Sequence, residues 1–346
     1  MNHAISDIRI RITAMWAFSE AFLGGILHAF HVPFAGLLLS SFAVMCMVAL
    51  TLHGHTKGQL LKATLLVIML KAILSPHTPV SAYFAVLLQG LFGEIFFFLG
   101  LPFFLSCLLL GIASLLQSSF QKLIILTLLF GVDFWEAMNE FLNSINKMMG
   151  AGDFNYSFYL VSIYIGLHFC AGIIVGIFCS RLPHYLSSSS LEFKSNEMNI
   201  PQTDFIFPNK NYKRSKFTKP IYWILLLLLI YALYQAYSES SILLLVKSKA
   251  MRLIVRSTLF LLLWYFFISP LLLIIFQKWL AKQKSKFTGE VESLIKLIPE
   301  MKFIVEKCWM ETKGNFGFKR IGKFIRFTFY MILKKDANTF GERGNS

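Results

Sequence analysis

Hydrophobic residues in this chain occur in long blocks rather than at the three-to-four-residue spacing of a soluble helical core. A hydrocarbon layer about 30 Å thick requires roughly 20 apolar residues in a helix that rises about 1.5 Å per residue. Eight blocks approach this length, and each predicts a membrane-spanning helix. They are Ile12–Phe30, Phe34–Leu52, Gln59–Leu74, Val80–Leu99, Leu101–Leu116, Phe158–Cys179, Ile221–Tyr237 and Thr258–Phe276. The pattern predicts an all-α, polytopic integral membrane helix bundle with about eight transmembrane helices.

The segment Gln121–Met149 fits this pattern only in part. Its first ten residues are mostly apolar, but Asp133, Glu136, Glu140 and Lys147 follow. It is compatible with a ninth span, a re-entrant helix or an amphipathic helix at the membrane surface. A topology of six spans, a basic linker and two further spans needs no crossing here, and it is the favoured interpretation.

Charge supports the membrane class and predicts the orientation. Only 15% of the residues are charged, whereas a soluble domain has about a quarter. Residues 1–180 carry seven Lys/Arg and seven Asp/Glu, so the net charge of +15 lies mostly in residues 181–219 and in the C-terminal tail. The positive-inside rule explains this distribution better than a nucleic-acid partner does. We expect a cell inner membrane location, with both termini cytoplasmic and no nucleic acid bound.

Four segments follow from these patterns. We expect a six-helix membrane module at 1–180, a basic cytoplasmic linker at 181–219, a two-helix membrane module at 220–278 and a basic tail at 279–346. The tail has an amphipathic helical pattern that Pro299 interrupts, and anionic membrane lipids attract such a surface. Its apolar positions are Leu294, Ile295, Leu297, Ile298, Met301, Ile304 and Val305, and a second amphipathic piece is Phe316–Leu333.

Ionisable residues inside the apolar blocks are costly in a membrane and are therefore candidates for binding a solute. Because a lone buried charge costs several kcal/mol, Lys71 should pair with Glu20 or Glu94 or reach an interface. The alternative to a solute-binding role is a structural ion pair. The candidate substrate-binding residues are Glu20, His28, His31, Lys71, His77, Glu94 and His168.

The histidines leave a metal site open as an alternative. His28 and His31 share one helical face and could join His77 in binding a metal or haem, whereas capping of helix ends is the simpler interpretation. His53 and His55 fall on the opposite side of the membrane in the favoured topology. The five cysteines form no CxxC pair and are typical of small apolar packing residues, so no cofactor is expected.

Missing motifs narrow the possible functions. The chain has no GxxxxGK[ST] phosphate loop, so any ATP-driven step requires another polypeptide. It also has no GxSxG or HExxH motif. We therefore expect no enzyme activity of its own.

The tail contains Ile-Pro-Glu-Met at 298–301 and Cys-Trp-Met-Glu-Thr-Lys-Gly at 308–314. These residues resemble the cytoplasmic coupling helices of the transmembrane (T) component of energy-coupling-factor transporters, which contain a proline and end in a pattern like Ala-Met-Glu-Ala-Arg-Gly. Met310, Glu311 and Gly314 match, and Lys313 stands at the arginine position. The resemblance implies that this segment contacts a separate ATPase subunit, with lysine keeping the charge but losing the planar fork of arginine.

The first 180 residues are similar in plan to the substrate-binding (S) components of the same transporters, which have six spans. The leading hypothesis is therefore a membrane subunit of an ATP-driven uptake transporter for a small solute, in which the tail contacts the ATPase. A second hypothesis is an integral-membrane enzyme of lipid or cofactor metabolism that uses Glu20, His28, Glu94 or His168. A third is a non-catalytic assembly factor for a membrane complex.

Overall fold

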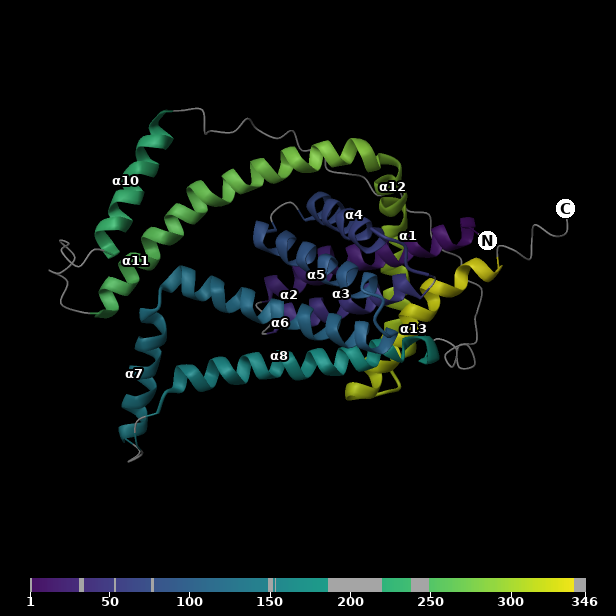
Figure 1. Cartoon of the computed structure of the whole chain (residues 1–346), viewed down its shortest axis with the longest axis horizontal. Helices are drawn as coiled ribbons and strands as arrows, with labels where there is room; N and C mark the ends of the chain where they lie inside the picture. The colour runs from purple at the N-terminus through teal and green to yellow at the C-terminus, as the bar shows by residue number, and fades with distance from the viewer. Residues whose placement is uncertain are drawn as a thin grey trace. The chain divides into compact units, whose positions relative to one another are not determined.

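The computed structural model describes residues 2–30, 34–52, 54–75, 78–148, 152, 154–185, 220–237 and 249–338. All regular secondary structure in these ranges is helical, which confirms the predicted all-α class (Figure 1). The elements are α1 (Asn2–Phe18), η1 (Ser19–Leu23), α2 (Gly24–Ala29), α3 (Ala35–Thr51), α4 (Gln59–Leu74), α5 (Val80–Phe98), α6 (Phe103–Phe130), α7 (Asp133–Met148), α8 (Tyr156–Ser180), α10 (Pro220–Tyr237), α11 (Lys249–Leu263), η4 (Trp264–Ile268), α12 (Ser269–Glu311) and α13 (Gly317–Asn338).

Five helical stretches in the described ranges are long and apolar enough to cross a membrane. They are Ile8–Leu27, Val80–Phe98, Phe103–Phe130, Tyr156–Ser180 and Ile254–Leu272. The apolar stretches Ala35–Thr51 and Trp223–Ala232 are helical but shorter. The lengths and composition therefore support a polytopic membrane protein, while the total of eight spans and the side on which the tail lies stay predictions.

The segment Gln121–Met149 divides at a glycine. Its apolar first part continues α6 to Phe130, and Gly131 then adopts a φ of +78°, which ends the helix. The charged part forms the separate helix α7, which has no buried residue. Phe141 and Met148 are exposed on α7, so this helix has an apolar face as well as a charged one.

The described residues form two compact units. The first contains the helices up to Ser118, α8 from His168 and the tail from Leu280, and the second contains the end of α6, α7, the start of α8, and α10 to the start of α12. In the second unit, the Arg256 guanidinium on α11 lies 2.6 Å from the Asp133 carboxylate on α7. The Trp135 indole also donates a hydrogen bond to Thr127, at 3.0 Å.

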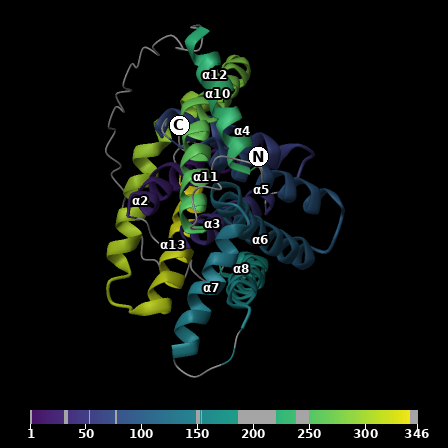
Figure 2. The ribbon, with the colours of Figure 1, turned by 90° about the vertical axis from the view of Figure 1, so that its left-hand side faces the viewer.

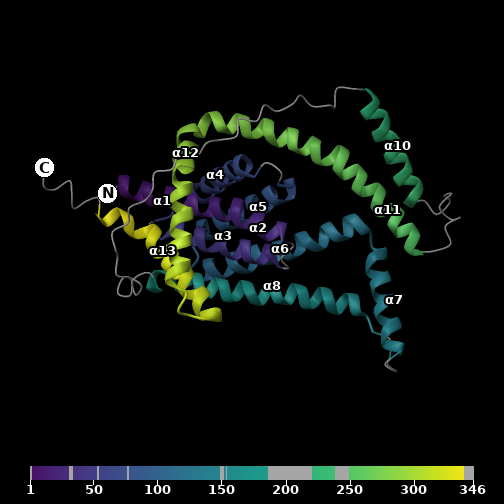
Figure 3. The ribbon, with the colours of Figure 1, turned by 180° about the vertical axis from the view of Figure 1, so that it is seen from behind.

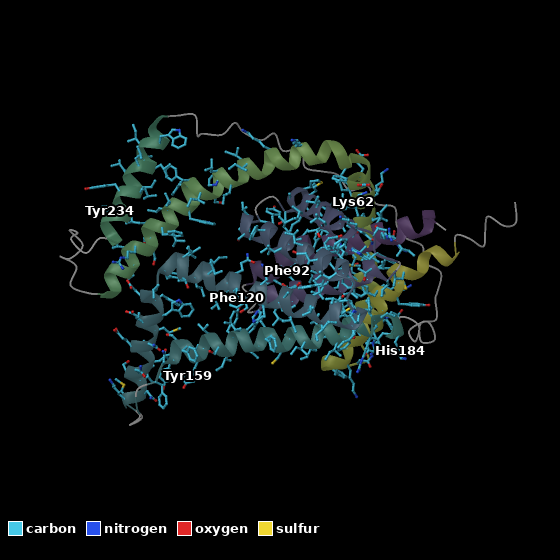
Figure 4. The ribbon with its side chains drawn as sticks, in the orientation of Figure 1. Lys62, Phe92, Phe120, Tyr159, His184 and Tyr234 are labelled. Carbon is cyan, nitrogen blue, oxygen red and sulfur yellow. The ribbon has the colours of Figure 1, made fainter. Side chains whose placement is uncertain are left out.

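Helix α1 is at the centre of the first unit. Every residue from 11 to 20 is buried, and a run of ten buried residues means that all faces of the helix are covered. Helices α3, α4 and α13 pack against it, and Figure 4 shows how densely side chains fill this bundle. Such a helix has no solvent-exposed face, so its polar side chains need partners within the protein.

Glycines allow close helix contacts in the first unit. A Cβ atom at Gly176 on α8 would lie 2.7 Å from the Leu108 Cα on α6, and one at Gly111 would lie 2.5 Å from the Gly172 carbonyl oxygen. Gly172 and Gly176 form a GxxxG pair, the spacing that lets membrane helices approach closely. Helix α5 also approaches α4 closely, because a Cβ at Gly90 would overlap Thr64.

We expect Gly176→Ala to destabilise the protein by about 1–3 kcal/mol, because backbone atoms of α6 occupy the position of the new methyl group. Thermal unfolding of the detergent-purified chain measures the effect. Gly166→Ala is the matched control on the same helix, since no atom lies within 4 Å of its Cβ position. Equal melting temperatures for the two variants would contradict the close α6–α8 contact.

Candidate functional site

A buried ion pair lies at the centre of the first unit. The Lys71 ammonium on α4 donates a hydrogen bond to the Glu20 carboxylate at 2.7 Å, and both side chains are at most 6% exposed. This contact confirms that Lys71 pairs with one of the two predicted acids, and it identifies that acid as Glu20. Because the two charges compensate each other, neither is left isolated in the apolar bundle.

Glu20 lies in the π-helical turn η1, which interrupts the α-helix between α1 and α2. Such a turn widens the helix by one residue and is frequent at functional sites. The preceding Ser19 hydroxyl donates to the Trp16 carbonyl oxygen at 2.7 Å, within this irregular region. The π-helical turn η1 therefore contains one member of the buried Glu20–Lys71 pair.

Glu94 has a different environment, at the N-terminus of α4. Its carboxylate accepts hydrogen bonds from the backbone N–H groups of Gly58, Leu60 (3.0 Å) and Leu61 (3.3 Å). The His55 Nε2 lies 3.6 Å away. These N–H groups have no partner within the helix, and the helix dipole favours a negative charge there. Glu94 thus caps α4, and it does not join Glu20 and Lys71.

The predicted histidines are only partly described. The His168 side chain on α8 is buried, and its ring lies 6.1 Å from the Phe34 ring. His31 and His77 lie outside the described residues, as does the side chain of His28. Within the described part of the chain, no group of three His, Cys, Asp or Glu residues could hold a metal ion.

A neutral polar cluster was missed by the sequence analysis, which considered only ionisable residues in the apolar blocks. The Gln89 side-chain amide nitrogen on α5 donates to the Ser40 hydroxyl on α3 at 2.9 Å and lies 3.5 Å from the side-chain Oε1 of Gln117 on α6. The signal was available in the sequence, because Gln89 is an uncharged amide within the block Val80–Leu99 and Gln117 directly follows the block Leu101–Leu116.

The C-terminal tail is attached to the N-terminal helix by a second buried ion pair. The Arg11 guanidinium on α1 donates to the Glu300 carboxylate on α12 at 2.9 Å, and both side chains are at most 8% exposed. The same Arg11 nitrogen lies 3.5 Å from the Met331 carbonyl oxygen on α13. One arginine therefore contacts both tail helices.

Apolar packing adds to this attachment. One face of α12 is buried at the spacing predicted for an amphipathic helix, and the buried residues are Val291, Leu294, Ile298, Met301, Ile304 and Cys308. On α13, Phe329 is fully buried and its ring lies 5.9 Å from the Phe42 ring on α3. Lys62 on α4, labelled in Figure 4, donates to Glu290 on α12 at 2.6 Å.

The predicted interruption at Pro299 is wrong, because α12 continues through this residue. Proline removes one backbone hydrogen bond from a helix, but the buried neighbours Ile298 and Glu300 hold the chain in place. The bend lies instead at Phe287, where φ is −121° and ψ is 22°. The tail helix proper therefore begins after Phe287 and runs without a break to Glu311.

The motif Met310–Gly314 lies where α12 ends and the chain turns toward α13 (Figures 2 and 3). Met310, Glu311, Lys313 and Gly314 are all exposed at this turn. The neighbouring Trp309 is half-exposed, and the Arg320 guanidinium of α13 lies 3.9 Å from its ring centre. We call the segment Trp309–Arg320 the tail tip. It presents apolar and basic side chains together.

Burial distinguishes Cys308 from this exposed tip. Burial raises the pKa of the Cys308 thiol to about 11, although a hydrogen bond with Thr328 on α13 acts to lower this pKa. A thiol with this pKa is almost entirely protonated at pH 8 and reacts slowly. Cys308 is therefore a reporter of whether the two tail helices stay packed.

No protein-family model, no curated protein and no solved structure matches this chain.

Lys71→Met should destabilise the protein by about 3–5 kcal/mol, because it leaves the Glu20 carboxylate buried without a counter-charge. The double variant Glu20→Gln/Lys71→Met should recover most of this loss. Thermal unfolding in detergent measures both. Lys62→Met is the control, since the Lys62–Glu290 pair is exposed and should contribute at most about 1 kcal/mol.

Arg11→Met should increase the rate at which a maleimide labels Cys308 at pH 8, because it removes the guanidinium that joins α1 to Glu300 on α12 and to Met331 on α13. The assay uses a Cys170→Ser background, since Cys170 is the exposed cysteine. Unchanged labelling of Cys308 would show that the ion pair does not hold the tail.

Proposed function

We propose that this chain is a membrane subunit of an ATP-driven transporter for a small solute, and that its tail couples the membrane bundle to a separate ATPase. The observation that carries the proposal is the buried Arg11–Glu300 pair, which joins the tail to the central helix of the bundle. A tail that only rested on lipid would not require a charge pair buried within the protein.

The connection supplies a route for mechanical coupling. Arg11 and Glu20 are nine residues apart on the continuous run formed by α1 and η1, about 14 Å along a helix. A displacement of α12 relative to the bundle acts on Arg11, and α1 carries it toward the Glu20–Lys71 pair. In this proposal the π-helical turn beside Glu20 is the position where α1 changes shape.

The composition of the tail tip supports a protein partner. Met310 and Phe316 are 62% and 87% exposed, and Lys313 and Lys319 add positive charge beside them. Apolar anchors surrounded by charges are typical of a docking surface. The chain lacks a phosphate loop of its own, so ATP hydrolysis would be performed by the partner. The proposal places both termini and the tail in the cytoplasm, where ATP is available.

The proposal predicts that a co-purifying ATPase is lost when the tail tip is changed. Lys313→Glu reverses a charge, and Gly314→Leu adds bulk at a position where no atom lies within 4 Å of the new Cβ, so neither variant should unfold the protein. Purification from native membranes followed by mass spectrometry and an ATP-hydrolysis assay measures the capture. We expect at least a tenfold decrease for each variant.

Lys302→Glu is the matched control, because Lys302 is equally basic, is exposed on the same helix and lies outside the tip. It should leave the ATPase bound. If all three variants retained the ATPase, the tail tip would not be the docking surface. If no ATPase is captured and Lys302→Glu weakens binding to anionic vesicles as much as Lys313→Glu, the tail is a lipid anchor and the proposal is wrong.

A further inference from the structure

The neutral cluster of Ser40, Gln89 and Gln117, together with Ser114 one turn before Gln117 on the same face of α6, has features of a binding site. Three helices contribute to it, namely α3, α5 and α6. Ser40, Gln89 and Ser114 are each at most 4% exposed. The four side chains are uncharged, so the cluster combines deep burial with hydrogen-bonding capacity and no net charge.

Two atoms of this cluster have no hydrogen-bond partner among the described residues. They are the Gln89 Oε1 and the Ser114 Oγ. A serine hydroxyl inside a helix normally donates to a carbonyl oxygen one turn earlier, as Ser41 does to Leu37 at 2.7 Å. Ser114 makes no such bond, although it lies one turn before Gln117 on the same face of α6. An unpaired acceptor on α5 and an unpaired hydroxyl on α6, one turn from the Gln117 that Gln89 contacts, are therefore both available.

The depth of the cluster makes these unpaired atoms costly. Gln89 is nine residues from the start of the nineteen-residue helix α5, about 14 Å along it and near its middle. At such a depth in a membrane bundle no bulk water is present to pair with a buried polar atom. Close packing on the neighbouring turn also limits rearrangement, since a Cβ at Gly36 on α3 would lie 2.5 Å from the Ser118 hydroxyl on α6.

We infer that this cluster binds a small uncharged molecule through an amide or imide edge. The ligand's N–H donates to the Gln89 Oε1, and its carbonyl oxygen accepts from the Ser114 hydroxyl. A carboxylate or ammonium is excluded because the cluster supplies no counter-charge. The inference rests on the proposed function, because the molecule bound here is the transported solute only if the chain is a transporter subunit. The ion pair Glu20–Lys71 is already compensated and is not part of this site.

Matched uncharged and charged compounds test the inference. The full chain in lipid nanodiscs is titrated with benzamide and uracil, and in parallel with benzoate and orotate, and saturable binding is measured by calorimetry and ligand-observed NMR. We expect at least one of the two uncharged compounds to bind and its carboxylate analogue to bind at least tenfold more weakly. Absence of binding by both uncharged compounds, or equal binding of a carboxylate, would overturn the inference.

Ser114→Ala is the decisive variant. It removes a hydroxyl that has no partner, so the empty protein should keep its melting temperature or gain stability. Binding of the uncharged compound should weaken about tenfold, because its carbonyl oxygen would then be buried without a donor. Gln89→Leu should abolish binding, whereas Ser41→Ala, the control on α3, should not affect it. Unchanged binding to Ser114→Ala would show that the site is elsewhere.

This experiment is independent of the ATPase assay, because it uses the isolated chain and no nucleotide. If the unmodified chain captures no ATPase but still binds uracil or benzamide, the proposed function is contradicted and the site remains. If the unmodified chain captures an ATPase but binds neither compound, the site is contradicted and the proposed function remains.

Discussion

The structure depends on the high cost of burying a charge without a partner. Arg11 and Glu300 are both almost fully buried, and each is tolerated because the other is 2.9 Å away. The two residues are separated by 289 positions in the sequence, so this contact joins the tail to the N-terminal helix. The apolar faces of α12 and α13 add area to the contact, but apolar area alone is not directional and would allow several positions.

The same constraint explains the interior of the bundle. The continuous run formed by α1 and η1 has no exposed face over residues 11–20, and this stretch carries two charged side chains, Arg11 and Glu20, about 14 Å apart. Each has a counter-charge on another helix, Glu300 on α12 and Lys71 on α4. The central helix therefore links the tail to the ion pair inside the bundle, and this link is the physical basis of the proposed coupling. The neutral Gln89 cluster differs because its polar atoms are only partly paired.

Contacts between apolar helices are stabilised by close packing rather than by charge pairs. Lipid tails are as apolar as leucine, so helices in a bilayer gain little from burying leucine against leucine, and close packing matters more. Gly111, Gly172 and Gly176 provide this contact between α6 and α8, and Gly90 provides it between α5 and α4. Glu94 completes the arrangement at one end of α4, where it pairs the free backbone N–H groups of that helix.

The positions of the helices were determined by the sequence itself, because a run of apolar residues in a helix is a local property. The blocks Gln59–Leu74 and Val80–Leu99 match α4 and α5 at nearly every residue, and the charges after Phe130 marked the change at Gly131. The sequence did not determine which side chains contact each other across helices. The sequence predicted that Lys71 pairs with Glu20 or Glu94 or reaches an interface, and only the tertiary structure identified Glu20 as the partner. Only the tertiary structure joined Arg11 to Glu300 and Gln89 to Ser40. Hydropathy measures how each residue interacts with its surroundings, whereas these contacts depend on which helix faces reach the same place in three dimensions.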